Sequence, residues 1–199
     1  MERAAAAAGF GTDKIGVMAH QFTTSYIEES LTVFRLSKKM AEGAMAQISD
    51  EQLFVTLDAE SNSVALIVKH MAGNMRSRWT DFLTSDGEKA DRDRDSEFEN
   101  PAATRATVME SWENGWKLVF SALEPLTDAD LGRTVMIRGE AHSVMQAINR
   151  QIAHYAQHIG QIVFLGKHLA GSNWKALTIP RNKSAEFNRR VVAGEASQR

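Results

Sequence analysis

The sequence predicts an all-α protein, a four-helix bundle with a short extended or hairpin segment before the fourth helix. The three prolines, Pro101, Pro125 and Pro180, each lie where a segment of periodic apolar residues begins or ends. Within these segments the apolar residues recur at steps of three and four, which is the period of one face of a helix. Four such long segments without a substantial strand pattern favour an antiparallel helical bundle.

The first two helices are predicted from apolar spacing and from one cap. The first is expected over about residues 14–43, where apolar side chains follow one another at three- and four-residue steps. The second is expected over about residues 63–83, because Asn62 or Ser63 can cap its first turn. Alternating charges and turn-forming residues then predict a connection over residues 84–101.

The third helix is expected to begin at Thr104 and to stop at Pro125. The stretch RTVMIRGE, residues 133–140, is rich in β-branched residues and contains a glycine, so it predicts an extended segment or a short hairpin. Ser143 and Gln146 then form a capping-box pattern at the start of the fourth helix. That helix should run to about residue 169 and end at a glycine.

A chain of 199 residues with 43% hydrophobic residues is long enough for one domain with a sizeable core. We expect a flexible N-terminus over residues 1–13, the bundle over residues 14–175 and a tail over residues 176–199. The end of this tail is expected to be disordered, because little after Asn188 could be buried.

Composition excludes several classes of function. The net charge is −2, and the 23 Lys and Arg are interspersed with 25 Asp and Glu, which disfavours binding to nucleic acid or to anionic lipid. No apolar run approaches the roughly 20 residues of a membrane span, and the alanine-rich start lacks the apolar core of a signal peptide, so we expect a cytoplasmic protein. The chain has no cysteine, so any metal must be held by nitrogen and oxygen atoms.

The stretch HYAQHIGQIV places two histidines four residues apart on the fourth helix. His154 and His158 differ by about 40° around the helix, so both imidazoles project from one face and can converge on one ion. The histidines of such a pair more often lie on the surface, or form hydrogen bonds in the core, than bind a metal. The pair also lacks the glutamate of the HExxH motif, so a zinc protease is poorly supported.

A third histidine strengthens the metal interpretation. His70 is expected at the edge of the apolar arc of the second helix, in a polar row with Ser63, Asn74 and Ser77. Three protein nitrogens with one open position are the arrangement of a catalytic metal site, whereas two bind weakly. The residues alone leave two alternatives open, a metal site and a polar rim that holds no ion.

The remaining histidines fit a structural or exposed role better. His168 lies about 15 Å along the helix from His158, too far to share an ion, and is expected to interact with the helix dipole. His20 and His142 are expected to be structural or exposed. Among carboxylates, Glu29 and Asp81 could approach the groove, but a surface position is favoured for both.

The charged segment RDRDSEF is expected to be a solvated or bundle-capping loop rather than a carboxylate metal site. Alternating arginine and aspartate residues there can satisfy one another. Trp112, Trp116 and Trp174 are expected to be anchors of the core or of the tail rather than a stacking platform.

Several stretches resemble the DinB-like (YfiT-like) metalloenzyme superfamily. They are SVALIVKHMAGNMRSRWTDFLTSDGE, RDRDSEFE, RGEAHSV, INRQIAHYAQHIGQIVFLGKHL and WKALTIPRNKSAEFN. The resemblance extends from about Met18 to Asn188, and its most specific element is HxxxHxGQI preceded by a distant helical histidine. It implies a bundle that holds a divalent metal, zinc or nickel, with three histidines. Matched by motif, these fall on His70, His154 and His158.

Members of this superfamily include transferases and isomerases that use the thiols bacillithiol or mycothiol, but the branch that this sequence resembles has no known reaction. We expect a metal-dependent thiol S-transferase or hydrolase, in which the metal lowers the pKa of a bound water or of a low-molecular-weight thiol. Without cysteine, that thiol would be a cosubstrate beside a small-molecule substrate. Asn74 and Gln161 are expected to orient a metal-binding histidine or the substrate.

The alternative is a non-catalytic bundle that binds a metal or ligand and acts in association or stress protection. The small residues Ala153, Ala156 and Gly160, beside Phe164, allow another helix to approach the fourth helix closely. That neighbour would lie inside the bundle or across a homodimer.

Overall fold

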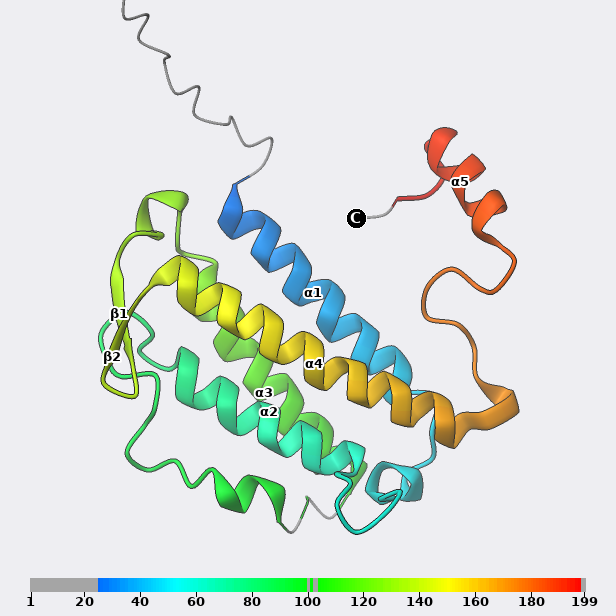
Figure 1. Cartoon of the computed structure of the whole chain (residues 1–199), viewed down its shortest axis with the longest axis horizontal. Helices are drawn as coiled ribbons and strands as arrows, with labels where there is room; N and C mark the ends of the chain where they lie inside the picture. The colour runs from blue at the N-terminus through cyan, green and yellow to red at the C-terminus, as the bar shows by residue number, and fades with distance from the viewer. Residues whose placement is uncertain (1–24, 100, 102–103, 198–199) are drawn as a thin grey trace, which may run out of the picture.

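The computed structural model describes residues 25–99, 101 and 104–197 of the chain. The long helices pack side by side, a hairpin lies at one end, and a further helix stands apart (Figure 1). The elements are α1 Tyr26–Met45, α2 Val64–Trp79, α3 Arg105–Leu123, β1 Thr134–Ile137, β2 Glu140–Ser143, α4 Val144–Ala170 and α5 Ser184–Val192. Over the described residues the protein is therefore mostly helical with one small sheet, which confirms the predicted all-α class.

The start of α1 differs from the prediction. Ser25 has extended backbone angles and its hydroxyl caps the helix, and the carboxylate of Asp128 accepts hydrogen bonds from the backbone N–H groups of Tyr26 and Ile27. These contacts satisfy amides that a helix leaves without an internal partner, so α1 begins at Tyr26 rather than near Lys14. Residues 1–24, and with them His20 and the predicted flexible N-terminus, lie outside the described residues.

The cap of α2 is confirmed, but its end is not. The Ser63 hydroxyl accepts a hydrogen bond from the Leu66 backbone N–H. The helix ends at Trp79 instead of near Leu83, because the chain leaves the helical conformation at Thr80 and takes a positive φ of 50° at Asp81.

The predicted boundaries of α3 and α4 are confirmed. Thr104 and Ser143 each form a capping box, and Gly171 ends α4 with a positive φ of 55°. The segment before α4 is a hairpin in which β1 and β2 pair antiparallel. Its two turn residues, Arg138 and Gly139, both have positive φ, 55° and 76°, as a type I′ turn requires.

The core lies between the four long helices. α1 packs against α3 and α4, and α2 packs against the same two helices. Phe34, Trp112, Trp116 and Tyr155 are each less than 2% exposed at its centre, and the ring centroids of Phe34 and Trp116 lie 6.0 Å apart in an edge arrangement. The predicted core positions of Trp112 and Trp116 are therefore confirmed, and Trp174 is partly buried against the same core.

The small-residue face of α4 is open to solvent. Ala153, Ala156 and Gly160 are exposed, a Cβ at Gly160 would meet no other atom within 4 Å, and Phe164 is 65% exposed. The interpretation that this face receives a helix of the same bundle is therefore wrong. Pairing of two copies across it remains a prediction.

The C-terminal tail contains a further helix. Ser184–Val192 form α5, which buries none of its residues, and disorder at the end of the tail stays a prediction. The expectation that little there could be buried is confirmed, since Val192 is 90% exposed. None of the helices in the described part of the chain has the length and apolarity needed to cross a membrane.

Candidate metal centre

Three imidazoles converge between α2 and α4. His154 Nε2 lies 3.3 Å from His70 Nε2 and 3.1 Å from His158 Nε2. One ligand nitrogen from each of the three histidines falls within 4.8 Å of the others. Three nitrogens bound at the usual zinc distance in a tetrahedral arrangement are separated by about 3.4 Å. The two Nε2 distances therefore match the spacing of ligands around one ion.

The helices bring these side chains together by simple packing. His154 and His158 stand one turn apart on α4, and His70 lies on α2 where the two helices contact each other. His70 is 3% exposed, whereas His154 and His158 are partly buried. The site thus has one buried ligand candidate and two that solvent can reach.

Hydrogen bonds on the far nitrogens orient two of the rings. His70 Nδ1 lies 2.8 Å from Glu97 Oε2, and His158 Nδ1 lies 2.8 Å from Gln161 Oε1. An ionised carboxylate and an amide oxygen only accept hydrogen bonds, so in both rings Nδ1 carries the proton. The Nε2 lone pairs of both rings are then free to bind a cation, which is the usual arrangement around protein metal sites.

Glu97 is itself held firmly. It lies in the short 3₁₀ helix η2, Asp95–Phe98, and is 6% exposed. Arg92 donates to both carboxylate oxygens, from Nε to Oε1 at 2.8 Å and from Nη2 to Oε2 at 2.9 Å. The next residue, Phe98, stacks on the His70 ring with a centroid distance of 4.6 Å. This loop therefore fixes both the position and the plane of the His70 imidazole.

Gly73 makes room for this carboxylate. A Cβ at Gly73, one turn of α2 after His70, would overlap Oε1 of Glu97. Because any larger side chain at this position would push Glu97 away, the glycine is required by the close approach of η2 to α2.

The role of this loop corrects the sequence analysis. The segment RDRDSEF, residues 92–98, was expected to be solvated or to cap the bundle, yet the side chains of Arg92 and Glu97 are buried, and Glu97 contacts His70. Metal-binding histidines commonly donate a hydrogen bond to a carboxylate, so an acidic residue beside one of them could be expected. Sequence alone could not choose among the acidic residues of the loop. Glu29 and Asp81, the carboxylates considered, are exposed and do not line the cleft beside the histidines.

The structure also shows where Asn74 and Gln161 lie, the two residues expected to orient a metal-binding histidine or the substrate. Gln161 contacts His158, as described. Asn74 is 5% exposed, lines the cleft beside the histidines and accepts a hydrogen bond from the Tyr155 hydroxyl at 3.2 Å. That hydroxyl in turn accepts one from Trp79 Nε1 at 2.9 Å, so Asn74 is tied to the core. His142 and His168 lie away from the cluster, His142 in β2 and His168 exposed in the last turn of α4.

Burial keeps the accessible imidazoles neutral. Burial, and then the nearby His158 and His70, lower the pKa of His154 to about 3. Burial also lowers the pKa of His158, against an opposing effect of the bond to Gln161. For Glu97, burial alone would raise the pKa, but hydrogen bonds from His70 and Arg92 outweigh it and the pKa is lowered. Around neutral pH His154 and His158 are therefore neutral, and the carboxylate of Glu97 beside His70 is ionised.

Comparison with known proteins gives a family for this chain. A family model described as protein of unknown function (DUF1572) matches residues 21–183, which include the three histidines and η2. The chain belongs to the DUF1572 family. Comparisons with curated proteins and with solved structures gave no match. The family description states no activity, so the function of this DUF1572 protein must be argued from its site.

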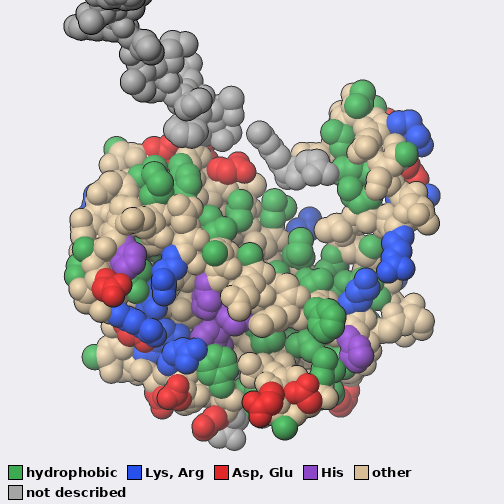
Figure 2. Space-filling model, in the orientation of Figure 1, with side chains coloured by type: hydrophobic (Ala, Val, Ile, Leu, Met, Phe, Trp, Pro, Cys, Tyr) green, Lys and Arg blue, Asp and Glu red, His purple; other side chains and the backbone are tan. Residues whose placement is uncertain are grey.

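The histidines of the DUF1572 protein open onto a cleft of about 370 Å³. Its lining contains five arginines and no aspartate or glutamate. The lining residues are His70, Asn74, Arg78, Arg92, Arg94, Phe98, Arg138, Arg150, Gln151, His154, Gln157 and His158. On the face displayed in Figure 2, basic side chains gather directly beside the histidine side chains. The cleft is therefore polar and positively charged.

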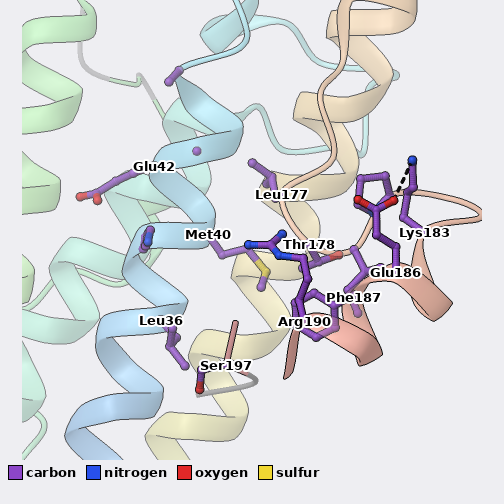
Figure 3. A pocket seen from close by; sticks show the side chains of 15 residues that line it. Leu36, Met40, Glu42, Leu177, Thr178, Lys183, Glu186, Phe187, Arg190 and Ser197 are labelled. Atoms are coloured by element: carbon purple, nitrogen blue, oxygen red, sulfur yellow. Dashed lines mark hydrogen bonds and ion pairs between the residues drawn. The ribbon is translucent and has the colours of Figure 1, made fainter. Parts of the chain in front are cut away.

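A larger hollow lies between α1 and the C-terminal tail (Figure 3). It has a volume of about 1150 Å³ and is lined by apolar side chains such as Leu36, Met40 and Leu177 and by charged ones from α5 and from Lys183, which precedes it. Two of these charged groups, Lys183 and Glu186, pair with each other at 2.9 Å. No histidine lines it among the described residues, so we assign the chemistry of the DUF1572 protein to the histidine cleft.

Proposed function

We propose that this protein is a DinB-like metal-binding protein in which His70, His154 and His158 hold one divalent cation, zinc or nickel. The observation that carries this proposal is the convergence of three Nε2 atoms, two of them on rings whose Nδ1 is bound by Glu97 or Gln161. Imidazole nitrogens suit zinc and nickel, which accept nitrogen ligands readily.

We propose further that the fold is a four-helix bundle of the DinB type. The reciprocal packing of α1 and α2 against both α3 and α4 supports this arrangement. The position of the ligand candidates supports it as well, because bundle metal sites are built from inward side chains on facing helices.

The reaction we propose is a metal-dependent thiol S-transfer or hydrolysis. A divalent metal with three histidine ligands keeps an open position and lowers the pKa of a water or thiol bound there. Glu97 would not act as a general base, since both of its oxygens are already held by His70 and Arg92. Its role would be to orient His70 and to make Nε2 a stronger electron donor.

Elemental analysis tests the metal site. Protein purified without chelator and reloaded with zinc or nickel should contain one metal ion per chain. His70→Ala should lose this stoichiometric metal, while His168→Ala, a matched histidine on the exposed end of α4, should retain it. Full metal content in the His70→Ala protein would show that the three-histidine arrangement is wrong.

The competing function is a non-catalytic bundle that binds a metal or ligand. The two are distinguished by incubating the metal-loaded protein with a low-molecular-weight thiol and a panel of electrophiles. Turnover that disappears with the metal supports the enzyme. A metal that raises only the melting temperature supports the binding protein, because any ligand of the folded state stabilises it.

A further inference from the structure

We propose that the histidine cleft binds a small anionic substrate, whose carboxylate or phosphate group contacts Arg150 at the rim while another part reaches the metal. This inference rests on the proposed metal site for the reacting end of the substrate. The arginine contacts themselves are argued, and tested, independently of the metal.

The lining of the cleft is rich in positive charge. It contains Arg78, Arg92, Arg94, Arg138 and Arg150, and no carboxylate. Some of these arginines pair with carboxylates outside the lining. Glu88 pairs with Arg78 at 2.8 Å, with Arg92 at 3.1 Å and with Arg138 at 3.3 Å, so one acid is shared by three guanidinium groups.

Two of the five arginines are structural. Arg78 is 5% exposed and Arg92 is also largely enclosed, and their charges are balanced by Glu88 and Glu97. They form the inner wall of the cleft and are not free to move toward a ligand. Their positive charge, in a partly enclosed space, still favours an anion in front of them.

The arginines at the rim are the ones that a ligand can reach. Arg150 is exposed and, in the part of the chain that the structure describes, makes no hydrogen bond or ion pair. Arg138 is anchored by its backbone N–H to Asp86 and touches Glu88 only through Nε, while Arg94 is held over the Phe98 ring with Asp95 3.8 Å away. Arg150 therefore carries the one rim charge that no described side chain neutralises.

Arg150 lies on the same side of α4 as two of the histidines. Arg150, His154 and His158 follow one another at four-residue steps on α4, so they form one column on the same side of the helix. Neighbours in such a column have Cβ atoms about 5 to 6 Å apart. An anionic group on Arg150 would therefore lie on the same side of α4 as an atom bound at the histidines.

The guanidinium group of Arg150 favours particular anionic groups. A guanidinium group offers a planar fork of donors that matches a carboxylate or a phosphate with two parallel hydrogen bonds. A cleft of about 370 Å³ is at the small end of the range for small-molecule sites, and Phe98 adds an aromatic wall beside His70. A compact compound with one oxyanion fits these features, and Phe98 is the one apolar side chain of the lining that the rest of the compound could contact.

Binding of simple probes tests the inference. Titrations of the full chain, zinc-loaded and metal-free, would measure the Kd of benzoate and of phenyl phosphate, with benzamide as the neutral control. Both anions should bind more tightly than benzamide, and the tighter of the two identifies the group recognised. Arg150→Gln should weaken the anion affinity about tenfold or more, because a charge-assisted hydrogen bond is lost.

Arg189→Gln is the matched control, since it removes the same charge from the exposed α5 and does not line the cleft. It should leave the anion affinity unchanged, and both variants should keep the metal content of the natural protein. If Arg150→Gln binds benzoate and phenyl phosphate as tightly as the natural protein, the inference is overturned, since the anions are then held by the metal or elsewhere. Absence of stoichiometric zinc would instead refute the proposed function, and titrations of the metal-free protein would still decide the arginine site.

Discussion

The carboxylate of Glu97 lies 2.8 Å from Nδ1 of His70 and joins the loop after α2 to the histidine cluster. It lies within a series of contacts in which Arg92 holds Glu97, Glu97 holds His70, and His70 faces His154. A ring held in this way meets a metal without losing further freedom of rotation. The loop is therefore part of the site, and the strength of metal binding should depend on it.

Replacing Glu97 by glutamine should weaken metal binding without removing the ligands. The amide preserves the shape but carries no charge, so His70 becomes a weaker donor, and changes of this kind typically cost about 10- to 100-fold in metal affinity. Competition with a chromogenic chelator would measure the affinity. Glu99→Gln, two residues away and exposed, is the control and should bind metal like the natural protein. Equal affinities for the two variants would contradict the role assigned to Glu97.

Gly73→Ala should disturb the site by displacing Glu97 from α2. The added methyl group overlaps the Glu97 carboxylate, and a buried overlap typically lowers the free energy of unfolding by about 1 to 3 kcal/mol. Metal affinity should fall as well, because His70 loses its partner. Urea unfolding and chelator competition would measure the two effects.

Gly160→Ala provides the comparison for this variant. It is also a helical glycine, but its Cβ would point into open space. Alanine favours the helix over glycine by about 1 kcal/mol, so Gly160→Ala should be at least as stable as the natural protein and bind metal normally. Equal destabilisation by both substitutions would mean that the loss at Gly73 does not come from Glu97.

The helices could be predicted because their signals are local. Ser63, Thr104 and Ser143 cap their helices through hydroxyls that lie three residues from the amide they accept from, and Arg138 with Gly139 marks the hairpin. The same locality made His154 and His158 visible as a pair. His70 could be proposed from its place at the edge of an apolar arc, but that it meets the pair depends on which faces of the two helices pack together, and there the resemblance added support.

Glu97 and the arginine-lined cleft could not be predicted for a physical reason. They depend on how an irregular loop folds over α2, and no period in the sequence records that path. The alternation of charges suggested that Arg92 and its neighbours neutralise one another in solvent. Instead, Arg92 turns inward to Glu97 and Glu88, while Asp91 pairs with Arg76 at the surface. Which charges of such a loop become buried is decided by tertiary contacts alone.

The metal-free protein should lose stability in mild acid. His154 has a pKa of about 3 in the folded protein against an ordinary value of 6.5, and the pKa of His158 is also lowered. Below about pH 6.5 the unfolded chain therefore takes up protons that the folded protein does not, so the free energy of unfolding falls as the pH decreases from there toward 3. Urea unfolding at pH 7 and pH 5 would measure this slope.

His154→Gln identifies the source of that slope, since it removes the group with the lowest pKa. The variant should lose less stability than the natural protein between pH 7 and pH 5. An unchanged slope would place the acid sensitivity elsewhere in the chain.

The Tyr155 hydroxyl should stabilise the wall of the site from inside the core. It accepts a hydrogen bond from Trp79 Nε1 and donates one to Asn74, and the Tyr155 side chain is 1% exposed. Burial also raises its pKa, so it stays a neutral donor. Tyr155→Phe leaves both partners buried without this contact, and each unsatisfied group costs about 1 to 3 kcal/mol. Urea unfolding would measure the loss of stability.

The matched variant Tyr26→Phe removes a hydroxyl that bonds to Asn149 near the surface. Its free energy of unfolding should therefore stay within about 0.5 kcal/mol of that of the natural protein. Because Asn74 lines the cleft, Tyr155→Phe should also weaken the binding of benzoate by the zinc-loaded protein, while Tyr26→Phe should not. Equal stability and equal benzoate affinity of the two variants would show that Asn74 keeps its position without the Tyr155 hydroxyl.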